Sequence, residues 1–587
     1  MRVARSCLCS PGGWRLCYVF TVSPHRERGK SFGFDYRRSS FESNKILTET
    51  ISNGFVFERD EEDGLTLSRR TILTGTLAAG AVAASPALAA PATQVERWGV
   101  FEIALPGPAQ GNPFDDVRVA AVFESDGRQV RVPGFYDGDG TYRIRFSPDA
   151  MGQWRWRSES NVAPLDGRTG AFRCGLPGKG NRGPVRVTRD GFHFAYDDGT
   201  PYRQIGTTSY SWALQSDAKC AETLATLAAA PFNKMRMLVF PNVPSVATDP
   251  FVRTGAGPRD WDATRFDPAY FRRYEDRLRK LGALGIEADV ILFHPYDAKR
   301  GYSDMRRADD ERYVRYVAAR FGAFRHVWWS MANEYDDVKS KTDADWDHLF
   351  QVLQAADPHD RLRSIHQIKR YYDHRKPWIT HASVQNGHAV LDDGRAELHR
   401  AMTEKPVIFD EVCYEGDIAK RWGNLSAQAL VERFWWGTIG GTYVGHSETF
   451  ASERNADFSW LGQGGTLRGT SAPRLAFLRR VLEDGPVPGI DPIQTWWGYR
   501  LGGREQAYYL RYFGEDSPRE WPVILPGKGA EALRTYRADI IDTWNMTITP
   551  AGSFTMAQMN DYDVHDPARP TLALPGKPWM AVRLVRT

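Results

Sequence analysis

The sequence lacks the patterns that mark disulfide-linked, metal-binding and nucleic-acid-binding proteins. It has only six cysteines, and the three beyond the first ninety residues are far apart and form no CxxC pair, so we expect neither a disulfide scaffold nor a zinc ribbon. No HExxH or comparable histidine spacing occurs, and we therefore expect no metal and no cofactor. The net charge is only +4 over 587 residues, which argues against a nucleic-acid partner.

Long apolar runs are also missing, but residues 66–90 carry the pattern of an export signal. Ser68-Arg69-Arg70 precedes a moderately apolar stretch, and Ala87-Leu88-Ala89 supplies a small-residue cleavage site. This order resembles a twin-arginine signal, whereas an alanine-rich helix opening the first domain is the alternative. We interpret residues 1–65 as a disordered extension or the result of a start site assigned too far upstream. The mature protein is then expected to be periplasmic or secreted, without a membrane anchor.

Aromatic residues are abundant, at 12% of the chain with 19 tryptophans. Sugar rings present apolar C–H faces that stack on indoles, so this excess suits a carbohydrate partner. Well-filled hydrophobic cores would use the same residues, and composition alone does not distinguish the two.

The folded part of the chain divides into three regions by its patterning. Residues 91–175 alternate polar and apolar residues, as in Thr141–Phe146, and predict an immunoglobulin-like antiparallel β-sandwich. Residues 176–200 are expected to be a linker with a hairpin around Phe192–Tyr196 that plugs the base of the next domain. Residues 488–587 return to strands and turns and predict a second sandwich.

Between these regions, residues 201–487 alternate strand and helix patterns, which is typical of a (β/α)₈ TIM barrel. The predicted fold class is therefore α/β plus all-β, a barrel flanked by two sandwiches. Predicted strands are 202–206, 233–239, 287–293, 327–331, 363–368, 378–382, 407–409 and 441–445, and the clearest helices are 309–321, 344–356, 426–438 and 473–484.

Two glutamates end apolar strands in this barrel. Glu334 follows the predicted fourth strand and Glu411 ends the predicted seventh, and these strands face each other across a barrel mouth. The C-terminal ends of barrel strands are where the catalytic residues of this fold lie. Paired carboxyl groups are what cleavage of a glycosidic bond needs. The structural alternative for each glutamate is a helix cap or a surface ion pair.

The residues around both glutamates resemble a known family. Asn333-Glu334 after strand four, with Glu411 in the run 406–415, is similar to glycoside hydrolase clan A, the retaining (β/α)₈ glycosidases, and to its apiosidase-like branch. The run 232–236 resembles the second strand of that group, so the resemblance covers most of residues 94–485.

This resemblance implies residue roles and a partner. Glu334 is expected to be the general acid/base and Glu411 the nucleophile, with Arg236 keeping Glu411 ionised and Asn333 bonding the hydroxyl next to the anomeric carbon. The implied partner is an oligo- or polysaccharide.

Further polar and aromatic residues follow the predicted strands and are candidates for substrate binding: His294, Tyr296, Trp212, Gln385 and His446. Each has a structural alternative, because histidines are often satisfied in cores and tryptophans usually pack. The sequence thus favours an exported retaining glycoside hydrolase acting on plant or microbial glycans. The alternatives are a non-catalytic carbohydrate-binding protein on a degenerate barrel and a surface protein.

Overall fold

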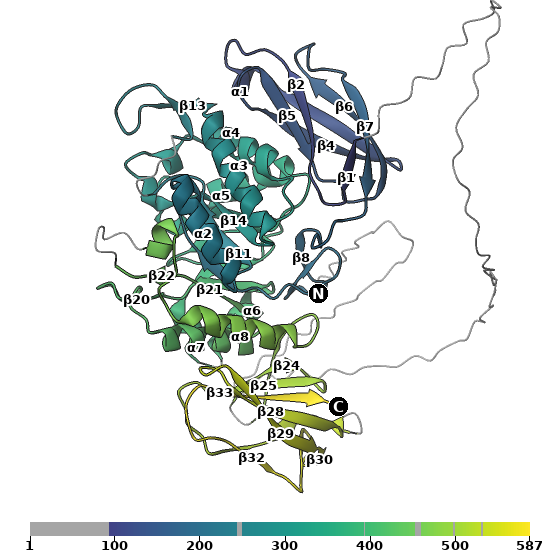
Figure 1. Ribbon diagram of the computed structural model, residues 1–587, viewed down its shortest axis with the longest axis vertical. Coiled ribbons are helices and arrows are strands. Elements are labelled where there is room, and N and C mark those ends of the chain that lie inside the picture. The colour runs from purple at the N-terminus through teal and green to yellow at the C-terminus, as the bar shows by residue number, and fades with distance from the viewer. Residues whose placement is uncertain (1–92, 243–248, 393, 452–458, 497–498, 530–531) are drawn as a thin grey trace, which may run out of the picture. The chain divides into compact units, whose positions relative to one another are not determined.

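The computed structural model describes residues 93–242, 249–392, 394–451, 459–496, 499–529 and 532–587 (Figure 1). The predicted export signal lies outside the described residues. Among those residues, no helix combines the length and apolarity that a bilayer crossing requires.

The N-terminal region is a sandwich made by one sheet that folds over on itself. The sheet order is β1-β7-β6-β3-β4-β5-β2, and every pairing is antiparallel except β1 with β7. Although β2 and β7 lie near opposite ends of this order, Phe101 and Phe172 stack with ring centroids 4.0 Å apart. The predicted sandwich is confirmed, with the parallel β1 as an addition. Its elements are β1 (Gln94–Glu96), β2 (Phe101–Pro106), α1 (Pro113–Asp116), β3 (Val119–Ser125), β4 (Arg128–Tyr136), β5 (Thr141–Phe146), β6 (Gly152–Ser160) and β7 (Thr169–Gly175).

A barrel of parallel strands follows and confirms the predicted fold class. It is closed because the first strand pairs with both the second and the eighth. Its strands are β10 (Gly206–Thr208), β11 (Lys234–Leu238), β14 (Glu287–Phe293), β15 (Val327–Ala332), β16 (Arg363–Ser364) with β17 (His366–Gln367), β18 (Ala382–Gln385), β19 (Val407–Glu411) and β21 (Tyr443–His446). The fifth strand is thus interrupted at Ile365.

Two predicted barrel strands were misplaced. The first was expected over 202–206 but begins at Gly206, because Tyr202 instead pairs with the hairpin below the barrel through its amide and Phe194 O, at 3.0 Å. The sixth was expected over 378–382 but begins at Ala382, because Trp378 lies in the preceding loop, where its carbonyl accepts from Arg363 Nε at 2.9 Å.

Helices surround the strands (Figure 1) and begin and end within about two residues of the predicted bounds. In α3, Tyr270, Tyr274, Leu278 and Leu281 recur at helical spacing and are all buried, so their burial ties the helix to the barrel. The helices are α2 (Asp217–Ala229), α3 (Pro268–Ala283), α4 (Arg307–Phe321), α5 (Asp343–Ala356), α6 (Arg395–Thr403), α7 (Ala427–Ile439) and α8 (Ser471–Glu483). Shorter elements in the loops are η1 (Trp212–Leu214), β12 (Phe251–Arg253), β13 (Trp261–Phe266), η2 (Pro295–Asp297), η3 (Tyr302–Asp304), η4 (Tyr335–Asp337), η5 (Gly387–Val390), β20 (Glu415–Gly416), β22 (Glu448–Thr449) and η6 (Ser459–Gln463).

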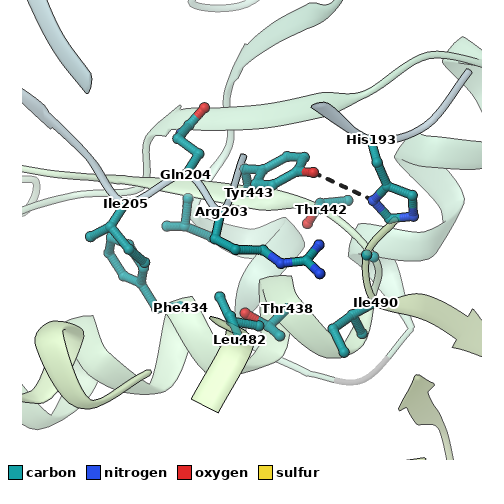
Figure 2. Close-up of a pocket in the computed structure, with 13 residues that line it drawn as sticks. His193, Arg203, Gln204, Ile205, Phe434, Thr438, Thr442, Tyr443, Leu482 and Ile490 are labelled. Carbon is teal, nitrogen blue, oxygen red and sulfur yellow. Dashed lines mark hydrogen bonds between the residues drawn. The ribbon is translucent and has the colours of Figure 1, made fainter. Parts of the chain in front are cut away.

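The base of the barrel is closed by a hairpin of β8 (Val185–Val187) and β9 (Phe194–Tyr196). Phe194 packs with Trp328 and Ile408, which extend inward from the strands. Beside it, Arg203 donates to Pro486 O at 2.5 Å, and His193 lies 3.4 Å from the Tyr443 hydroxyl (Figure 2). The cavity here measures about 30 Å³, which is room for about one water molecule.

The C-terminal region is built on a six-stranded antiparallel sheet of order β23-β24-β25-β33-β28-β29. Short strand pairs cover one face of it and enclose a core that includes Trp521, Tyr536 and Phe554. The strands are β23 (Asp491–Ile493), β24 (Leu501–Arg504), β25 (Tyr508–Tyr512), β26 (Glu520–Pro522), β27 (Ile524–Pro526), β28 (Thr535–Asp542), β29 (Thr547–Thr555), β30 (Ala557–Gln558), β31 (Asp563–His565), β32 (Thr571–Ala573) and β33 (Met580–Arg586).

Candidate active site

A cleft of about 1070 Å³ lies at the carboxyl ends of the barrel strands. Glu334 and Glu411 both line it, although 77 positions separate them in the sequence. The loops after strands five, six and seven supply most of its wall. The volume suits a ligand of one to several sugar rings, because small-molecule sites span roughly 300–1,000 Å³.

Glu334 lies just beyond the end of β15, where the chain turns into η4. Its backbone has φ 44° and ψ 51°, the left-handed conformation that non-glycine residues rarely adopt. Such strained residues cluster at functional sites, where the surroundings hold them in place. Burial, and then the charge of Glu411, raises the pKa of Glu334 to about 7, and a hydrogen bond from the Tyr296 hydroxyl partly opposes that rise.

Glu411 is the last residue of β19 and is held as an anion. Burial alone would raise the pKa of Glu411, but His366 and Arg236 outweigh burial and lower it. Arg236 Nη1 donates to Oε1 at 3.1 Å, and the Tyr210 hydroxyl donates to the same oxygen. His366 Nδ1 is 4.0 Å away, but burial lowers the pKa of His366 to about 4, so the lasting cation at neutral pH is Arg236.

Asn333 connects the surroundings of the two carboxyl groups. Its amide oxygen accepts from Arg236 Nη2 at 2.6 Å, and its Nδ2 donates to the hydroxyls of Tyr296 at 2.8 Å and Tyr210 at 3.3 Å. The Tyr296 hydroxyl in turn donates a hydrogen bond to Glu334, and the Tyr210 hydroxyl donates one to Glu411. One hydrogen-bond network therefore fixes both carboxyl groups, and it orients the Asn333 amide.

Beneath this network, a buried ion cluster holds Arg236 in place. Lys234 Nζ lies 2.8 Å from Asp289 Oδ2 and 2.9 Å from Asp410 Oδ1. Arg236 Nε is 4.0 Å and 3.8 Å from the same two oxygens. Ser383 Oγ also donates to Asp410 at 2.6 Å. Asp410 is thus paired inside the barrel and does not line the cleft.

Five of the seven expected substrate-binding residues do not line the cleft: Arg236 and Asn333, which are buried in the network around the two glutamates, and Trp212, His294 and His446. Trp212 is fully buried, with its indole against Met237 Sδ, and offers no ring to a sugar. His294 is also buried: Nε2 contacts Phe240 O at 2.9 Å and Nδ1 accepts from the Tyr296 amide at 3.2 Å, so it supports Tyr296 instead. His446 packs outside the strand ring beside Thr207. In contrast, Tyr296 and Gln385 do line the cleft.

Several cleft residues escaped sequence reasoning because they lie in loops without periodicity. Trp422 and Tyr371 are 36% and 43% exposed and present aromatic surface in the cleft, where sugar faces stack. Tyr210, two residues beyond β10, was detectable as a polar aromatic residue directly after a barrel strand. Other lining residues are Asn242, Gln367, Lys369, Asn386, Tyr414, Arg421 and Asn424.

The arrangement combines one carboxyl group that is a proton donor near neutral pH with one that stays ionised. Such divergent pKa values in a single site identify an acid and an anionic partner. The chemistry suited to this pair is protonation of a leaving group together with attack on, or stabilisation of, an electron-poor carbon.

Comparisons with known proteins point to the same chemistry. Residues 188–449 match the family described as apiosidase-like, catalytic domain. Residues 94–161 and 496–585 match two domains of unknown function, DUF5060 and DUF5605. The chain is 37% identical to a Bacteroides vulgatus protein assigned as a glycoside hydrolase, with a TM-score of 0.80, covering 84% of this chain and 100% of that one. A family 5 glycoside hydrolase from the same organism, 16% identical with a TM-score of 0.52 over 69% of this chain and 94% of that one, shares the fold. No curated protein matches the chain.

Proposed function

The chain belongs to the glycoside hydrolases, with an apiosidase-like catalytic domain, and we propose that it is exported and cleaves plant or microbial glycans with retention of anomeric configuration. The observation that carries this proposal is the pair of cleft carboxyl groups with opposite pKa shifts. A glycosidase needs one carboxyl group that is still protonated and one that is ionised at working pH, whether it retains or inverts configuration. Retention is proposed from the resemblance of the barrel to the retaining glycosidases of clan A.

In the first step, Glu411 attacks the anomeric carbon while Glu334 gives its proton to the departing glycosidic oxygen. The C–O bond to the leaving group breaks, and an ester forms between the sugar and Glu411. Arg236 and Tyr210 occupy both lone pairs of Oε1, which leaves Oε2 to attack the anomeric carbon, and the charge of Arg236 keeps the carboxylate from taking up a proton.

In the second step, Glu334, now ionised, takes a proton from a water molecule that attacks the same carbon. The ester bond breaks, Glu411 is released as an anion, and Glu334 regains its proton. Asn333 is buried and bonded to Arg236, Tyr296 and Tyr210, so it supports this mechanism by holding the partners of both carboxyl groups in position.

The substrate class follows from the cleft lining. Trp422 and Tyr371 supply aromatic faces, and Asn386, Gln385 and Gln367 supply amide groups that both donate and accept hydrogen bonds. Stacking faces combined with neutral amides suit a polyhydroxylated ring, so we propose an oligo- or polysaccharide substrate.

The decisive experiment is a screen of the purified protein on aryl glycosides and plant-wall or microbial oligosaccharides, run beside Glu334→Gln, Glu411→Gln and the exposed control Glu505→Gln. We expect the control to match wild type and each cleft variant to lose at least about 100-fold in kcat. Near-normal turnover of unactivated substrates by either cleft variant would contradict the catalytic roles of Glu334 and Glu411. Binding of sugars by wild type without any turnover would favour a carbohydrate-binding role.

Retention and export are tested separately. Proton NMR of the first-formed sugar should show the anomer of the substrate, and the opposite anomer would exclude double displacement. For export, the full chain in a bacterial host should reach the periplasm, and Arg69→Lys with Arg70→Lys should keep it in the cytoplasm. Equal distribution of both forms would count against a twin-arginine signal.

A further inference from the structure

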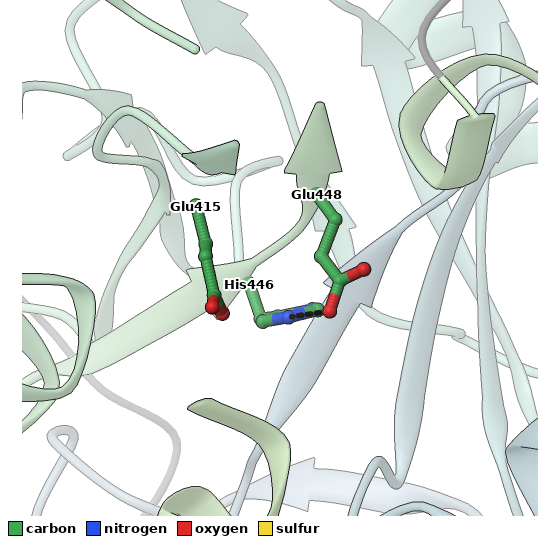
Figure 3. Close-up of side chains that lie close together, drawn as sticks. All are labelled: Glu415, His446 and Glu448. Carbon is green, nitrogen blue, oxygen red and sulfur yellow. Dashed lines mark ion pairs between the residues drawn. The ribbon is translucent and has the colours of Figure 1, made fainter. Parts of the chain in front are cut away.

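A second cluster of titratable groups lies outside the catalytic cleft, where strands seven and eight end. Glu415 in β20, His446 at the end of β21 and Glu448 in β22 are all buried, and one ligand atom from each lies within 4.8 Å of the other two (Figure 3). β20 and β22 pair in parallel, which brings the two glutamates together. None of the three lines the cleft.

The His446 ring has one nitrogen engaged and one nitrogen without a hydrogen bond. Nδ1 is 3.0 Å from Thr207 Oγ1, which also accepts from Trp460 Nε1 at 2.9 Å. The ring stacks on Phe232 with centroids 4.6 Å apart. Among the described residues, the fully buried Nε2 has no hydrogen-bond partner, and it faces Glu448 Oε1 at 3.8 Å.

The two carboxylates have hydrogen-bond donors but no directly paired lysine or arginine among the described residues, and the charge of Arg468 acts on Glu448 from beyond ion-pair distance. Within the described part of the chain, no lysine or arginine nitrogen forms an ion pair with Glu415 or Glu448, whereas the barrel carboxylates Asp289 and Asp410 share Lys234. Placing two anions in a buried site without a cation is costly.

The backbone amides that face these carboxylates come from the end of the loop before α8 and from the first residue of α8. Glu415 accepts from the amides of Thr470 at 2.7 Å and Ser471 at 3.1 Å. Glu448 accepts from the amides of Arg468 at 2.7 Å and Gly469 at 3.0 Å.

Each carboxylate oxygen accepts one amide, so each keeps a lone pair for a further partner. A Cβ at position 469 would collide with oxygens of both glutamates, so Gly469 allows the loop to approach them.

We propose that Glu415, His446 and Glu448 together bind one divalent transition-metal cation, of which Zn²⁺ is the representative. Two carboxylates and one imidazole are a donor set that such ions take in proteins. The cation would engage the unpartnered Nε2 and balance both negative charges.

Zn²⁺ sits about 2.0–2.2 Å from its ligands in tetrahedral sites, so its donor atoms are about 3.4 Å apart. The present spacing of up to 4.8 Å would therefore have to close by up to about 1.4 Å when the ion binds. The imidazole argues against Ca²⁺ and Mg²⁺, which prefer oxygen ligands.

The site has a structural consequence for the cleft. Glu415 follows Cys413 and Tyr414, which line the cleft wall, and the amides of Thr470 and Ser471 belong to the start of α8. A bound cation would therefore tie the strand-seven loop, the strand-eight loop and α8 together. Its role would be to brace the cleft, and it would not contact the substrate.

The test begins with the wild-type full chain, stripped with EDTA and titrated with Zn²⁺ alone. We expect about one tightly bound ion per chain by mass spectrometry of the metal, and a melting temperature that rises by several degrees on adding Zn²⁺ back. Co²⁺ in place of Zn²⁺ should give visible absorption bands from the same site. The proposal would be overturned if no ion bound above background and the melting temperature changed with neither EDTA nor Zn²⁺.

Variants then assign the ligands. His446→Gln and Glu448→Gln should weaken Zn²⁺ binding at least about 100-fold and abolish the response to EDTA. His348→Gln is the matched control, because His348 pairs with Glu311 at 2.7 Å in a half-exposed position, and it should bind like wild type. The contrary result is that Glu448→Gln folds with a melting temperature at or above that of wild type and still binds Zn²⁺ like wild type. That result would show that the cluster is held by hydrogen bonds to a protonated Glu448 and is not a metal site. If a variant does not fold, the wild-type Zn²⁺ and Co²⁺ titrations decide.

Discussion

The protonation of Glu334 offers the sharpest quantitative test of the double-displacement mechanism. A pKa of about 7 means that about nine tenths of the enzyme carries the catalytic proton at pH 6 and about one tenth at pH 8. For glycosides with poor leaving groups, kcat/KM of wild type should therefore fall about tenfold per pH unit above 7. The acid limb should lie below pH 4.5, because the pKa of Glu411 is lowered from its ordinary value of 4.5.

Replacing Glu334 by Gln keeps the shape of the side chain and removes the proton. A general acid contributes about 10²–10⁴-fold, which is about 3–5 kcal/mol of transition-state stabilisation. The full loss should appear with an alkyl leaving group. A 2,4-dinitrophenyl leaving group departs without a proton, so the first step should stay within about tenfold of wild type, and a burst of released phenol should precede a slow second step.

The assay is kcat/KM from pH 5 to 9 for both leaving groups, in wild type, Glu334→Gln and the control Glu505→Gln. In Glu334→Gln the alkaline limb near pH 7 should disappear, while the control keeps it. Equal losses for the two leaving groups, or an alkaline limb that survives the substitution, would refute the assignment of Glu334 as the acid.

Three other predictions follow from the same site. Arg236→Met should lower kcat/KM about 10²–10³-fold and move the acid limb upward, because losing the cation raises the pKa of Glu411; a pH profile with an unmoved acid limb would contradict it. Trp422→Ala should raise KM about tenfold with little change in kcat, and steady-state kinetics showing the loss in kcat alone would argue against stacking. Glu334→Gln should have a higher melting temperature than wild type at pH 8 but the same melting temperature as wild type at pH 4. In wild type, Glu334 keeps its proton up to about pH 7 in the folded state but loses it above pH 4.5 in the unfolded state. The free energy of unfolding of wild type therefore falls by about 3 kcal/mol across that window, and the variant avoids this loss. Equal melting-temperature changes at both pH values would contradict this.

The strands that sequence placed best are those with long buried apolar runs. The strand over 287–293 was predicted at its exact bounds, because Glu287–Phe293 is buried at every position, as parallel barrel strands are. The first and sixth strands are only three and four residues long. Apolar residues next to them, such as Tyr202 and Trp378, pack in the flanking loops, and periodicity does not separate them from strand residues.

In the candidate site too, some features could be predicted from local sequence patterns, whereas others depend on tertiary packing. That Glu334 and Glu411 face one cleft depends only on strand order and on the end of the strand at which each lies. Whether a side chain points into the cleft depends on its neighbours. Trp212 faces Met237 in the core, whereas Trp422 reaches the cleft from a loop without periodicity. Likewise, Glu415, His446 and Glu448 meet only after β20 and β22 have paired, so no spacing in the sequence indicated them.

The charges inside the barrel help to explain why the pKa of Glu334 is raised and how this pKa can fall during turnover. Lys234 and Arg236 face three anions, Asp289, Asp410 and Glu411, so the interior already carries an excess negative charge before Glu334 ionises. A further anion in a buried site is unfavourable, so burial and the charge of Glu411 raise the pKa of Glu334 to about 7 and about half of the enzyme keeps this proton at neutral pH. In the proposed double displacement, the sugar is esterified to Glu411, so that anion is gone and the two cations are balanced by the two aspartates alone. The electrostatic cost of ionising Glu334 then falls, which is what the second step requires of a base. Lys234, Arg236, Asp289 and Asp410 thus sum to zero charge, so the site reaches −1 when one of the two glutamates is ionised and −2 only when both are.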